Sequence, residues 1–452
     1  MRLAARRPRQ FDVLLEPSKH AHTSEVLVGP RIERQFLRNA ARRQLTATEL
    51  VHDLQPILEE ERNEEFQMSD QPSASGRKKR HSKKLLPTTG ERWSTDKFNV
   101  SRYHQYPEIL QWLNNLTTTY PEIVSRIDFN RSYLGNELVG VKIGVARPTN
   151  VDSHGHEHSM EQVEKPKIWI DGGMHSREYI AISSVIYVIH ALVKSYTNGD
   201  ERTRALLEKY DFHILPVSNP DGYIYTWTTD RLWRKTRSMH HTKKCIGVDP
   251  NRNWDFKWAN GDIGLRFPCS QIYAGPSAFS EPEIVSISNY VLSLRPHLHL
   301  YLSIHAYGQV ILAPWGWQTR LPATFLKQKD AAQAAILAIR RSSGKSYTFG
   351  SIANLLYEAA GTSIDFMHHH GVPYSYGFEL RPKNNQPTDS TARRKRDFDS
   401  KTKKTPSNST VGVQPTVKSA FIVRPDEIEP TGKELFAAVE ALARHVALVQ
   451  KL

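Results

Sequence analysis

The chain has 452 residues, 39% of them hydrophobic, so it can bury a large core, and no apolar run is long enough to predict a membrane span. Its formal net charge of +14 lies in three polar segments, residues 1–10, 77–84 and 393–404, which carry +4, +6 and +5. Because the remainder is about neutral, composition argues against a nucleic-acid-binding face and predicts solvated tails or processing sites, with polyanion (heparin) contact as an alternative.

Three regions differ in composition along the chain. Residues 11–66 combine short apolar runs with a helical pattern at 49–66, which predicts a small α+β unit. Residues 67–97 are polar and are expected to form an exposed linker. From residue 98 to 452 the pattern is globular, except that residues 383–418 are poor in apolar side chains and are expected to be a disordered surface insertion.

Within the globular region, strand-like and helix-like runs alternate. Strands are predicted at 137–146, 165–171, 210–219, 300–314 and 375–380, and helices at 106–121, 179–196, 280–294, 323–343 and 432–450. This alternation predicts an α/β fold, with a mixed, largely parallel twisted sheet and helices on both of its faces. Ligands of such sheets bind at the carboxyl ends of the strands.

Histidine and glutamate form H-x-x-E pairs at four places in the sequence. About two H-x-x-acid pairs are expected by chance, so spacing alone is a weak signal. His175 and Glu178 follow the apolar run IWID and a Gly-Gly turn, at the carboxyl end of a predicted strand. The other pairs lie in polar segments: His22/Glu25, His154/Glu157 and His158/Glu161. We therefore interpret His175 and Glu178 as the functional pair.

A third metal ligand is expected from another strand end, and His305 in the run LYLSIHAYG supplies it. A single histidine in such a run is more often a satisfied core residue. Two histidines and one glutamate are a plausible zinc set, since catalytic zinc takes three protein ligands and leaves one position for water. We predict one Zn²⁺ per chain.

Several motifs together resemble those of the A/B-type zinc carboxypeptidases. They stand in the family's order as HSRE, RLWRKTRS, GVDPNRNWD, LSIHAYG, LLYEAAGTSIDF and YSYGFELR. The resemblance covers residues 98–452 apart from the insertion, and residues 11–66 more loosely resemble the family's inhibitory prosegment without its first strand. It implies a zymogen of an exopeptidase that acts on peptide C-termini, with zinc bound by His175, Glu178 and His305.

The resemblance also implies catalytic roles. Glu379, in YGFELR, would be the general base that activates water and later passes the proton to the leaving amine. Arg237, in RLWRKTRS, would be the positive donor to the oxyanion of the tetrahedral intermediate. Arg177 and Arg234 would line the cleft as substrate-binding residues.

Recognition of a free C-terminal carboxylate is implied for the motif DPNRNWD. Asn251 and Arg252 match the family's carboxylate anchors, and the planar fork of an arginine binds a carboxylate in bidentate fashion. Tyr357 matches the tyrosine that closes over the substrate, and Tyr307 is a further expected substrate contact.

The specificity pocket can be carried over in the same way, and its deepest position is Ile364. Its lining would be Leu312, Gly316, Ile352, Leu356, Thr362, Ile364 and Gly377. Members that remove basic residues carry an acidic residue at the deepest position. An isoleucine leaves a substrate Lys or Arg unpaired, at a cost of several kcal/mol, so we predict release of hydrophobic or aromatic C-terminal residues. The neighbouring Asp365 complicates this prediction, although A-type enzymes share it.

Three positions depart from the family pattern. Tyr179 replaces a Trp after HSRE, and Ala306 replaces a Ser after the third ligand. Pro382 replaces an Asp after FELR, where the insertion begins, and this raises the question of whether the backbone beside Glu379 keeps its course.

The two cysteines, Cys245 and Cys269, have two readings. In a secreted protein they would form a disulfide worth roughly 3–4 kcal/mol on the chain-entropy model, and in a cytosolic protein they would be free thiols. The first residues lack the apolar segment of a secretory signal. We expect a secreted protein with the disulfide and an incomplete N-terminus.

The basic run RKKR at 77–80 predicts cleavage after Arg80 by a furin-like convertase, which would free the enzyme from residues 11–66. The run RRKR at 393–396 is a weaker candidate for a second cut. The alternative function is a catalytically inactive relative that binds peptide C-termini, heparin or matrix. The physiological substrate and the oligomeric state do not follow from the sequence.

Overall fold

The computed structural model describes residues 11–15, 24–47, 53–59, 61, 98–146, 164–240, 244–383 and 421–449. Several predictions lie outside these residues. They concern the linker 67–97 with its cleavage site at Arg80, the run 393–396, nearly all of the predicted insertion 383–418, and the H-x-x-E pairs that involve His22, His154 and His158.

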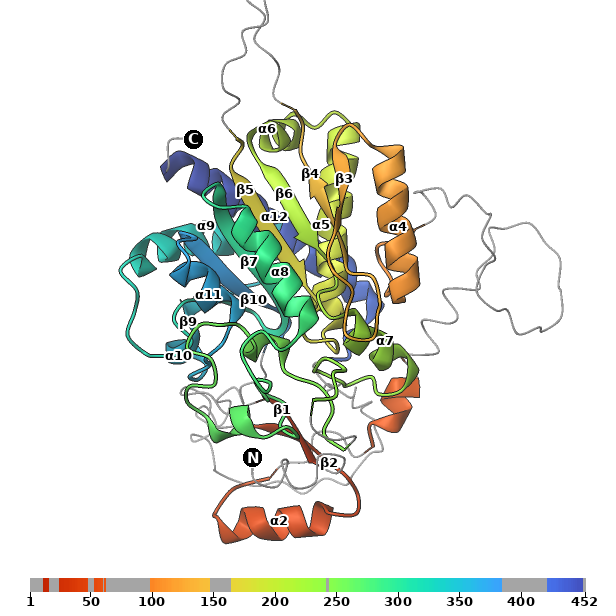
Figure 1. Cartoon of the computed structure of the whole chain (residues 1–452), viewed down its shortest axis with the longest axis vertical. Coiled ribbons are helices and arrows are strands. Elements are labelled where there is room, and N and C mark those ends of the chain that lie inside the picture. The colour runs from red at the N-terminus through yellow and green to blue at the C-terminus, as the bar shows by residue number, and fades with distance from the viewer. Residues whose placement is uncertain are drawn as a thin grey trace, which may run out of the picture.

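Eight strands form one mixed sheet, in the order β3-β4-β6-β5-β7-β10-β8-β9 (Figure 1). Their bounds are β3 (Val124–Asp128), β4 (Val139–Ile143), β5 (Lys167–Gly172), β6 (Asp211–Leu215), β7 (Leu298–Gly308), β8 (Val310–Ala313), β9 (Thr348–Ser351) and β10 (Tyr374–Lys383). The central strands β6, β5, β7 and β10 run parallel, whereas β3/β4, β4/β6 and β10/β8 are antiparallel pairs. The predicted mixed, largely parallel sheet is confirmed.

The predicted strands differ from the observed ones in two respects. The single run expected at 300–314 is two strands, because the chain reverses at Gly308 and Gln309, both at positive φ (157° and 55°). The strands β3 and β9 were not predicted, since both are short edge strands with few buried residues and little apolar alternation.

Helices cover both faces of the sheet, as the alternation predicted (Figure 1). They are α4 (Tyr106–Thr119), α5 (Tyr179–Thr197), α6 (Glu201–Lys209), α7 (Pro220–Thr228), α8 (Pro282–Ser293), α9 (Phe325–Ser343), α10 (Ile352–Leu355), α11 (Ser363–His369) and α12 (Ile428–Val449). The helices that the sequence did not predict, α6, α7, α10 and α11, are all short. Three 3₁₀ turns occur in the described loops, η2 (Pro250–Arg252), η3 (Ile263–Arg266) and η5 (Pro425–Glu427).

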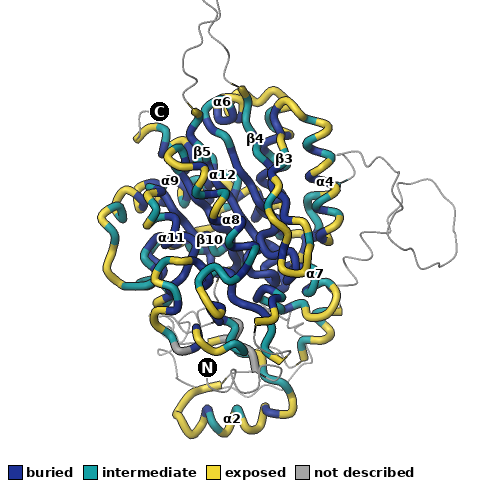
Figure 2. The backbone as a smooth tube through the Cα atoms, viewed as in Figure 1, coloured by how far each residue is buried: buried dark blue, intermediate teal, exposed yellow. Residues whose placement is uncertain are grey.

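The core is divided by the sheet because successive strand residues point to opposite faces. On β5, Ile168 and Ile170 join a large cluster with α4, α5, α9 and α12, whereas Trp169 joins the cluster under α8 and α11. Both faces of the central strands are therefore buried (Figure 2). Polar side chains at the strand ends are held by rigid elements on either side.

Helix α5 is long and apolar enough to cross a membrane by composition, and it is the one such helix in the described part of the chain. However, 67% of its apolar window is buried inside the protein. It packs on the central strands and on α12, which is the environment of a core helix.

Strand β10 continues through Pro382 to Lys383; Glu379 and Leu380 keep their register with β7, and the register shifts between Leu380 and Lys383. Arg381 anchors this strand end by ion pairs to Glu434 and Glu427.

In the N-terminal region the two apolar runs pair as an antiparallel two-stranded sheet, β1 (Phe11–Leu15) with β2 (Glu25–Val28). Helix α2 (Glu33–Arg42) follows, and residues 55–59 form a helical turn within the predicted helical pattern. Most of the described side chains of α2 are exposed.

Candidate active site

His175, Glu178 and His305 meet at the carboxyl ends of two parallel strands. His175 and Glu178 lie in the turn between β5 and α5, and His305 lies on β7, the neighbour of β5. The turn requires Gly173 at φ +67°, where a Cβ would lie 2.9 Å from Ile182 Cγ1. The Gly-Gly signal in the sequence thus marks a backbone bend that turns both side chains toward β7.

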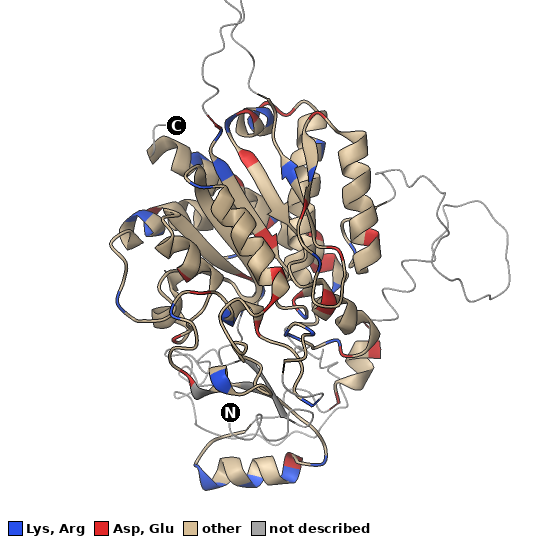
Figure 3. Cartoon of the chain, viewed as in Figure 1, with Lys and Arg blue, Asp and Glu red and all other residues tan. Residues whose placement is uncertain are grey.

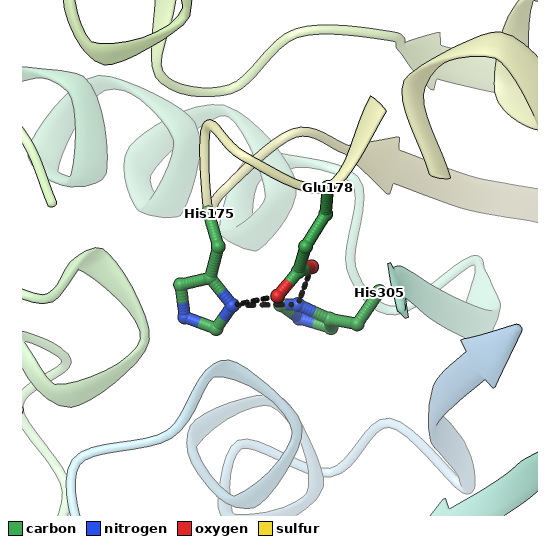
Figure 4. A group of neighbouring side chains, drawn as sticks. All are labelled: His175, Glu178 and His305. Atoms are coloured by element: carbon green, nitrogen blue, oxygen red, sulfur yellow. Dashed lines mark hydrogen bonds and ion pairs between the residues drawn. The ribbon is translucent and has the colours of Figure 1, made fainter. Parts of the chain in front are cut away.

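The three side chains face one another around a common point (Figure 4). His175 Nδ1 lies 2.8 Å from Glu178 Oε1, and His305 Nδ1 lies 3.0 Å from Glu178 Oε2 and 3.1 Å from His175 Nδ1. One donor atom from each residue lies within 4.8 Å of the others, and all three residues are buried. A set of two imidazole nitrogens and one carboxylate oxygen fits a zinc ion with an open fourth position.

A second layer of polar groups holds the three donors in place. The other ring nitrogen of His175 is 3.2 Å from Asp249 Oδ1, and that of His305 is 3.1 Å from Ser303 Oγ. Ser303 in turn donates to Asp171 Oδ1 at 2.8 Å. Partners of this kind fix the ring orientation of histidine ligands and raise their basicity.

The charges of the cluster are coupled. Burial favours the neutral form of Glu178, but His175 and His305 together hold the pKa of its carboxyl group below its usual value. The pKa of His175 is lowered by burial and by Arg234, whereas Glu178 outweighs burial and raises the pKa of His305. A carboxylate that stays ionised is a competent metal ligand.

Glu379 lies on β10 directly across from His305 on β7, in parallel register. Adjacent strands are about 4.8 Å apart, so its side chain borders the cluster. Burial and the negative charge of Glu178 raise the pKa of Glu379 to about 8. A carboxyl group whose proton affinity is raised in this way suits proton transfer near neutral pH.

Arg234 lies beside the cluster, whereas Arg237, the predicted oxyanion donor, lies against two aromatic rings. Arg234 Nη1 is 3.9 Å from Glu178 Oε1, and its guanidinium donates to Asp249 Oδ2 at 2.9 and 3.2 Å. The guanidinium of Arg237 instead lies over the rings of Tyr225 and Trp233, 3.6 and 4.4 Å from their centroids. The two arginines share one motif, and the fold places the second one against two aromatic rings that are nearly perpendicular to each other.

Arg177 and Tyr307 both contact the ring of Phe421. The Arg177 guanidinium is almost fully buried, 4.3 Å from the centre of the Phe421 ring, and the Tyr307 ring is 5.1 Å from that of Phe421. Arg231 also contacts this group, donating to the backbone carbonyls of Arg177 and Phe421 at 2.9 and 3.0 Å. Neither Phe421 nor Arg231 was predicted as a site residue, although Arg231 begins the motif RLWRKTRS, three residues before Arg234.

The predicted carboxylate anchors lie together on η2. Arg252 is buried and donates to the Asn251 carbonyl at 2.7 Å, and its Nη2 lies 3.4 Å from the Tyr357 hydroxyl. Asn251 Oδ1 accepts from the Ser363 amide at 2.9 Å, and Asn251 Nδ2 points to His305 Nε2 at 3.4 Å. The structure therefore brings Asn251, Arg252 and Tyr357 to the His305 side of the cluster.

Ile364 is 97% buried beside strand β10 and the loop after β8. A Cβ on Gly377 would lie 3.8 Å from Ile364 Cδ1 and 3.7 Å from Leu312 Cβ, so these predicted lining residues do lie together. Both oxygens of the adjacent Asp365 accept from the Gly316 amide at 2.9 Å, and one accepts from Trp317 at 3.1 Å. Asp365 is thus engaged by the backbone rather than turned toward Ile364, although burial raises its pKa to about 7.

The two cysteines form a disulfide, Cys245–Cys269, with a Cα–Cα distance of 4.6 Å. It closes the loop that carries η2, and with it Asn251 and Arg252. Of the two readings of the cysteines, the structure supports the bridged one.

Asp249 is the one central residue that the sequence reasoning missed. It bridges His175 and Arg234. Burial raises the pKa of its carboxyl group, but Arg234, Arg252 and the His175 ring outweigh burial and hold that pKa well below the usual value. Its position two residues before Asn251, inside the motif GVDPNRNWD, was an available signal.

The departures at 179 and 306 are accommodated by the site. The Tyr179 ring lies 3.5 Å below the Arg231 guanidinium, and its hydroxyl donates to Thr226 at 2.9 Å. Ala306 contributes its backbone amide, 3.2 Å from Glu178 Oε2. Neither substitution removes a group from the cluster.

Comparison with known proteins gives a consistent result. A family model described as zinc carboxypeptidase matches residues 109–438. Zinc carboxypeptidase A 1 of Drosophila melanogaster is 38% identical over 291 residues, which are 64% of this chain and 64% of that protein. Carboxypeptidase B of Astacus astacus is 35% identical over 347 residues, which are 76% of this chain and 97% of that protein.

Among solved structures, the carboxypeptidase A from Helicoverpa armigera superposes with a TM-score of 0.76 at 25% identity. The superposition covers 98% of this chain and 93% of that one. The similarity therefore extends over nearly the whole length of both chains.

Proposed function

The chain belongs to the zinc carboxypeptidase family of metallohydrolases, and on that premise we propose that it removes single residues from the C-termini of peptides. One observation carries the proposal. A buried group of three potential metal ligands lies beside a carboxylate, Glu379, and beside two arginines, Arg234 and Arg252, the second of which can bind a carboxylate.

His175, Glu178 and His305 would bind one Zn²⁺ per chain, with Asp249 and Ser303 orienting the two imidazoles. The metal would act as a Lewis acid and lower the pKa of a bound water. The chain itself fixes the geometry of the metal-binding atoms, because the second ring nitrogen of each histidine already has a hydrogen-bond partner.

Glu379 is assigned the role of general base. It lies next to His305 in register, and burial raises its pKa to about 8. Its carboxylate would take the proton of the attacking water and then deliver it to the nitrogen of the departing amino acid. The same oxygen atoms thus serve both halves of the reaction.

Arg234 is assigned the role of oxyanion donor in place of Arg237. Its guanidinium is fixed by two hydrogen bonds to Asp249 and reaches within 3.9 Å of Glu178, at the edge of the cluster. A pre-oriented cation stabilises the negative charge that develops on the carbonyl oxygen without having to reorganise.

Arg252 and Asn251 explain why the enzyme would be an exopeptidase. A buried guanidinium with a hydroxyl at 3.4 Å is suited to bidentate binding of a free terminal carboxylate. An internal peptide bond offers no carboxylate, so only the last residue would be placed correctly against Glu379 and Arg234. Tyr357 would exchange its contact with Arg252 for one with the substrate.

The pocket around Ile364 favours a hydrophobic or aromatic C-terminal side chain. Ile364, Leu312 and Gly377 present apolar surface, and both oxygens of Asp365 accept from backbone amides. A substrate Lys or Arg would lose its hydration without gaining a partner, at a cost of several kcal/mol.

Residues 11–66 would form the inhibitory prosegment of a secreted zymogen. Glu61 makes a bidentate ion pair with Arg231, at 2.8 Å for both bonds, and the pair is buried. Since Arg231 also donates to the backbone carbonyls of Arg177 and Phe421, this ion pair connects the segment to the residues beside the candidate active site. Cleavage after Arg80 by a furin-like convertase would release it, and the disulfide is consistent with an extracellular location.

The zymogen proposal is tested by replacing Glu61→Gln in the uncleaved chain. Loss of the charge leaves Arg231 buried without its partner, so the segment should detach more often and the uncleaved protein should become several-fold more active. Glu59→Gln, at an exposed position two residues earlier, is the matched control and should change nothing. Equal activity of both variants would remove the support for an inhibitory contact.

The enzymatic proposal is tested with blocked dipeptides that end in Phe, Leu or Arg, incubated with the processed protein. We expect release of free Phe and Leu, little release of Arg, and complete inhibition by a chelator. Activity that a chelator does not affect would contradict the proposal. Rapid release of Arg would contradict the pocket assignment and leave the reaction class intact.

A further inference from the structure

Helix α2 presents three arginines on one line. Arg34, Arg38 and Arg42 are four residues apart, so each is rotated by about 40° from the previous one and the three span about 12 Å along the helix. All three are exposed. We refer to Arg34, Arg38 and Arg42 as the α2 arginine stripe.

The α2 arginine stripe faces away from the protein. Ala40, the buried residue of the helix, lies on the opposite side, about 200° from Arg38, and Phe36 on that same side is half-buried. Exposed Arg31 and Arg43 flank the two ends of the stripe, and Glu33 is the single acidic residue of the helix. Figure 3 shows this succession of basic bands along α2.

None of these arginines forms an ion pair with any residue that the structure describes. The one side-chain hydrogen bond within the stripe runs from Arg38 Nε to the Arg34 carbonyl at 3.2 Å. Elsewhere in the described chain, arginines at functional positions are paired: Arg231 with Glu61, Arg234 with Asp249 and Arg381 with Glu434. Five exposed cations lie close together in sequence without an ionic partner among the described residues, so they repel one another, and a bound polyanion would remove that repulsion.

We propose that the α2 arginine stripe is a binding surface for a linear sulfated polysaccharide. Guanidinium groups bind sulfate oxygens in the same forked geometry that they use for phosphate and carboxylate. A row of cations on one straight helix face matches a chain of regularly spaced anions better than it matches a single small anion. The disulfide places the protein in an oxidising compartment, where sulfated glycans are the abundant polyanions.

Two other polyanions fit less well. The exposed face of α2 offers no aromatic ring on which a nucleic-acid base could stack, since Phe36 is turned toward the protein. A membrane-binding helix needs a broad apolar face for the acyl boundary, whereas α2 exposes one large apolar side chain, Leu37.

The test uses full-length protein in which the basic residues of 77–84 and 393–404 are replaced by Gln, so that those segments do not contribute. Retention on immobilised heparin is compared before and after adding Arg34→Gln, Arg38→Gln and Arg42→Gln. The control adds Lys327→Gln, Lys329→Gln and Arg340→Gln, which removes the same charge from exposed positions of α9.

We expect the background protein to bind heparin and the α2 triple variant to bind at least tenfold more weakly, with a salt dependence that is shallower by about two to three ions. The α9 triple variant should lose less than twofold. An Arg→Lys version of the α2 triple variant keeps the charge but lacks the forked donors, so it should bind more tightly than the Gln variant and more weakly than the background protein. Absence of binding by the background protein, or equal losses in both triple variants, would overturn the proposal. Stronger competition by anionic lipid vesicles or DNA than by soluble heparin would overturn the choice of a sulfated glycan.

Discussion

Two buried polar regions of this molecule have opposite organisation. Around His175, Glu178 and His305 the polar atoms converge on one point, and each ring is oriented from behind by Asp249 or Ser303. Near α7 and α8, two buried carboxylates, Asp221 and Glu283, instead bind the loop between β3 and β4.

In that second region each carboxylate accepts a hydrogen bond from a different backbone amide of the loop. Asp221 Oδ2 accepts from the Leu134 amide at 2.8 Å and Glu283 Oε1 from the Tyr133 amide at 2.9 Å. Three donors, from Ser132, Leu134 and Asn136, meet at Asp221, but they hold a loop, and the described residues form no second group of possible metal ligands. Burial of polar groups alone therefore does not indicate a functional site, whereas the convergence of potential metal-ligand atoms on one point does. Changes in the first region should alter catalysis, and changes in the second should alter stability.

The largest effect is expected for Glu379→Gln. The amide keeps the shape of the side chain but cannot accept the proton of water, so kcat should fall by about 10³-fold or more. Steady-state kinetics and metal analysis of the same preparation would check this, because the variant should still bind one zinc per chain. Substantial residual turnover would assign the base to another group.

The next effect separates Arg234 from Arg237. Arg234→Gln removes a fixed cation from the cluster and should lower kcat by about 10²–10³-fold with little change in KM. Arg237→Gln removes a cation that is stacked on Tyr225 and Trp233, and should cost stability but less than tenfold in kcat. The reverse order of the two kcat values would restore the interpretation made from the sequence.

A smaller effect is expected in the pocket. Ile364→Asp places a carboxylate at the deepest position and should shift the ratio of kcat/KM for Arg over Phe substrates by about 10–100-fold. Ile364→Asn, which has the same size but no charge, is the matched control. An unchanged ratio in Ile364→Asp would show that this side chain does not contact the substrate.

The smallest effect is in the second region, and it appears in stability. Burial raises the pKa of Glu283 from 4.5 to about 8, so the folded state retains a proton that the unfolded state releases. This contribution to stability is complete below about pH 4.5 and is lost as the pH rises toward 8. Glu283→Gln should therefore stabilise the protein by up to about 4 kcal/mol at pH 7.5 and by little at pH 4, without changing kcat.

Denaturant unfolding at the two pH values measures this directly. Glu281→Gln serves as a contrasting variant, because Glu281 is ion-paired to His240 at 2.7 Å and should lose stability on substitution. A destabilised Glu283→Gln at pH 7.5 would mean that the carboxylate is ionised in the folded protein.

The sequence predicted those parts of the site whose signals are local. The strand end and the Gly-Gly bend identified His175 and Glu178, and an apolar run identified the strand of His305. The resemblance assigned the oxyanion role to Arg237. The packing of Arg237 against Tyr225 and Trp233, with Arg234 beside the cluster, could not be read from the basic motif. The ion pair between Glu61 and Arg231 joins residues 170 positions apart, so no local sequence pattern predicts it.

The same reasoning applies to the fold. Long buried elements such as α5 and β5 were predicted because their residues repeat an apolar pattern. The short strands β3 and β9 were missed because edge strands carry few buried residues, and β7 and β8 were merged because both are apolar and only the backbone at Gly308 and Gln309 separates them.

The central claim is that three side chains converge to bind one metal ion, and the most direct measurement is zinc content per chain by elemental analysis. The account predicts one zinc in the purified protein and its return after chelation and dialysis against zinc. It also predicts at least a tenfold loss of affinity in His305→Ala but not in His213→Ala, a buried histidine on β6 outside the cluster. Protein that is folded but binds no zinc, or binds it equally well without His305, would contradict the account.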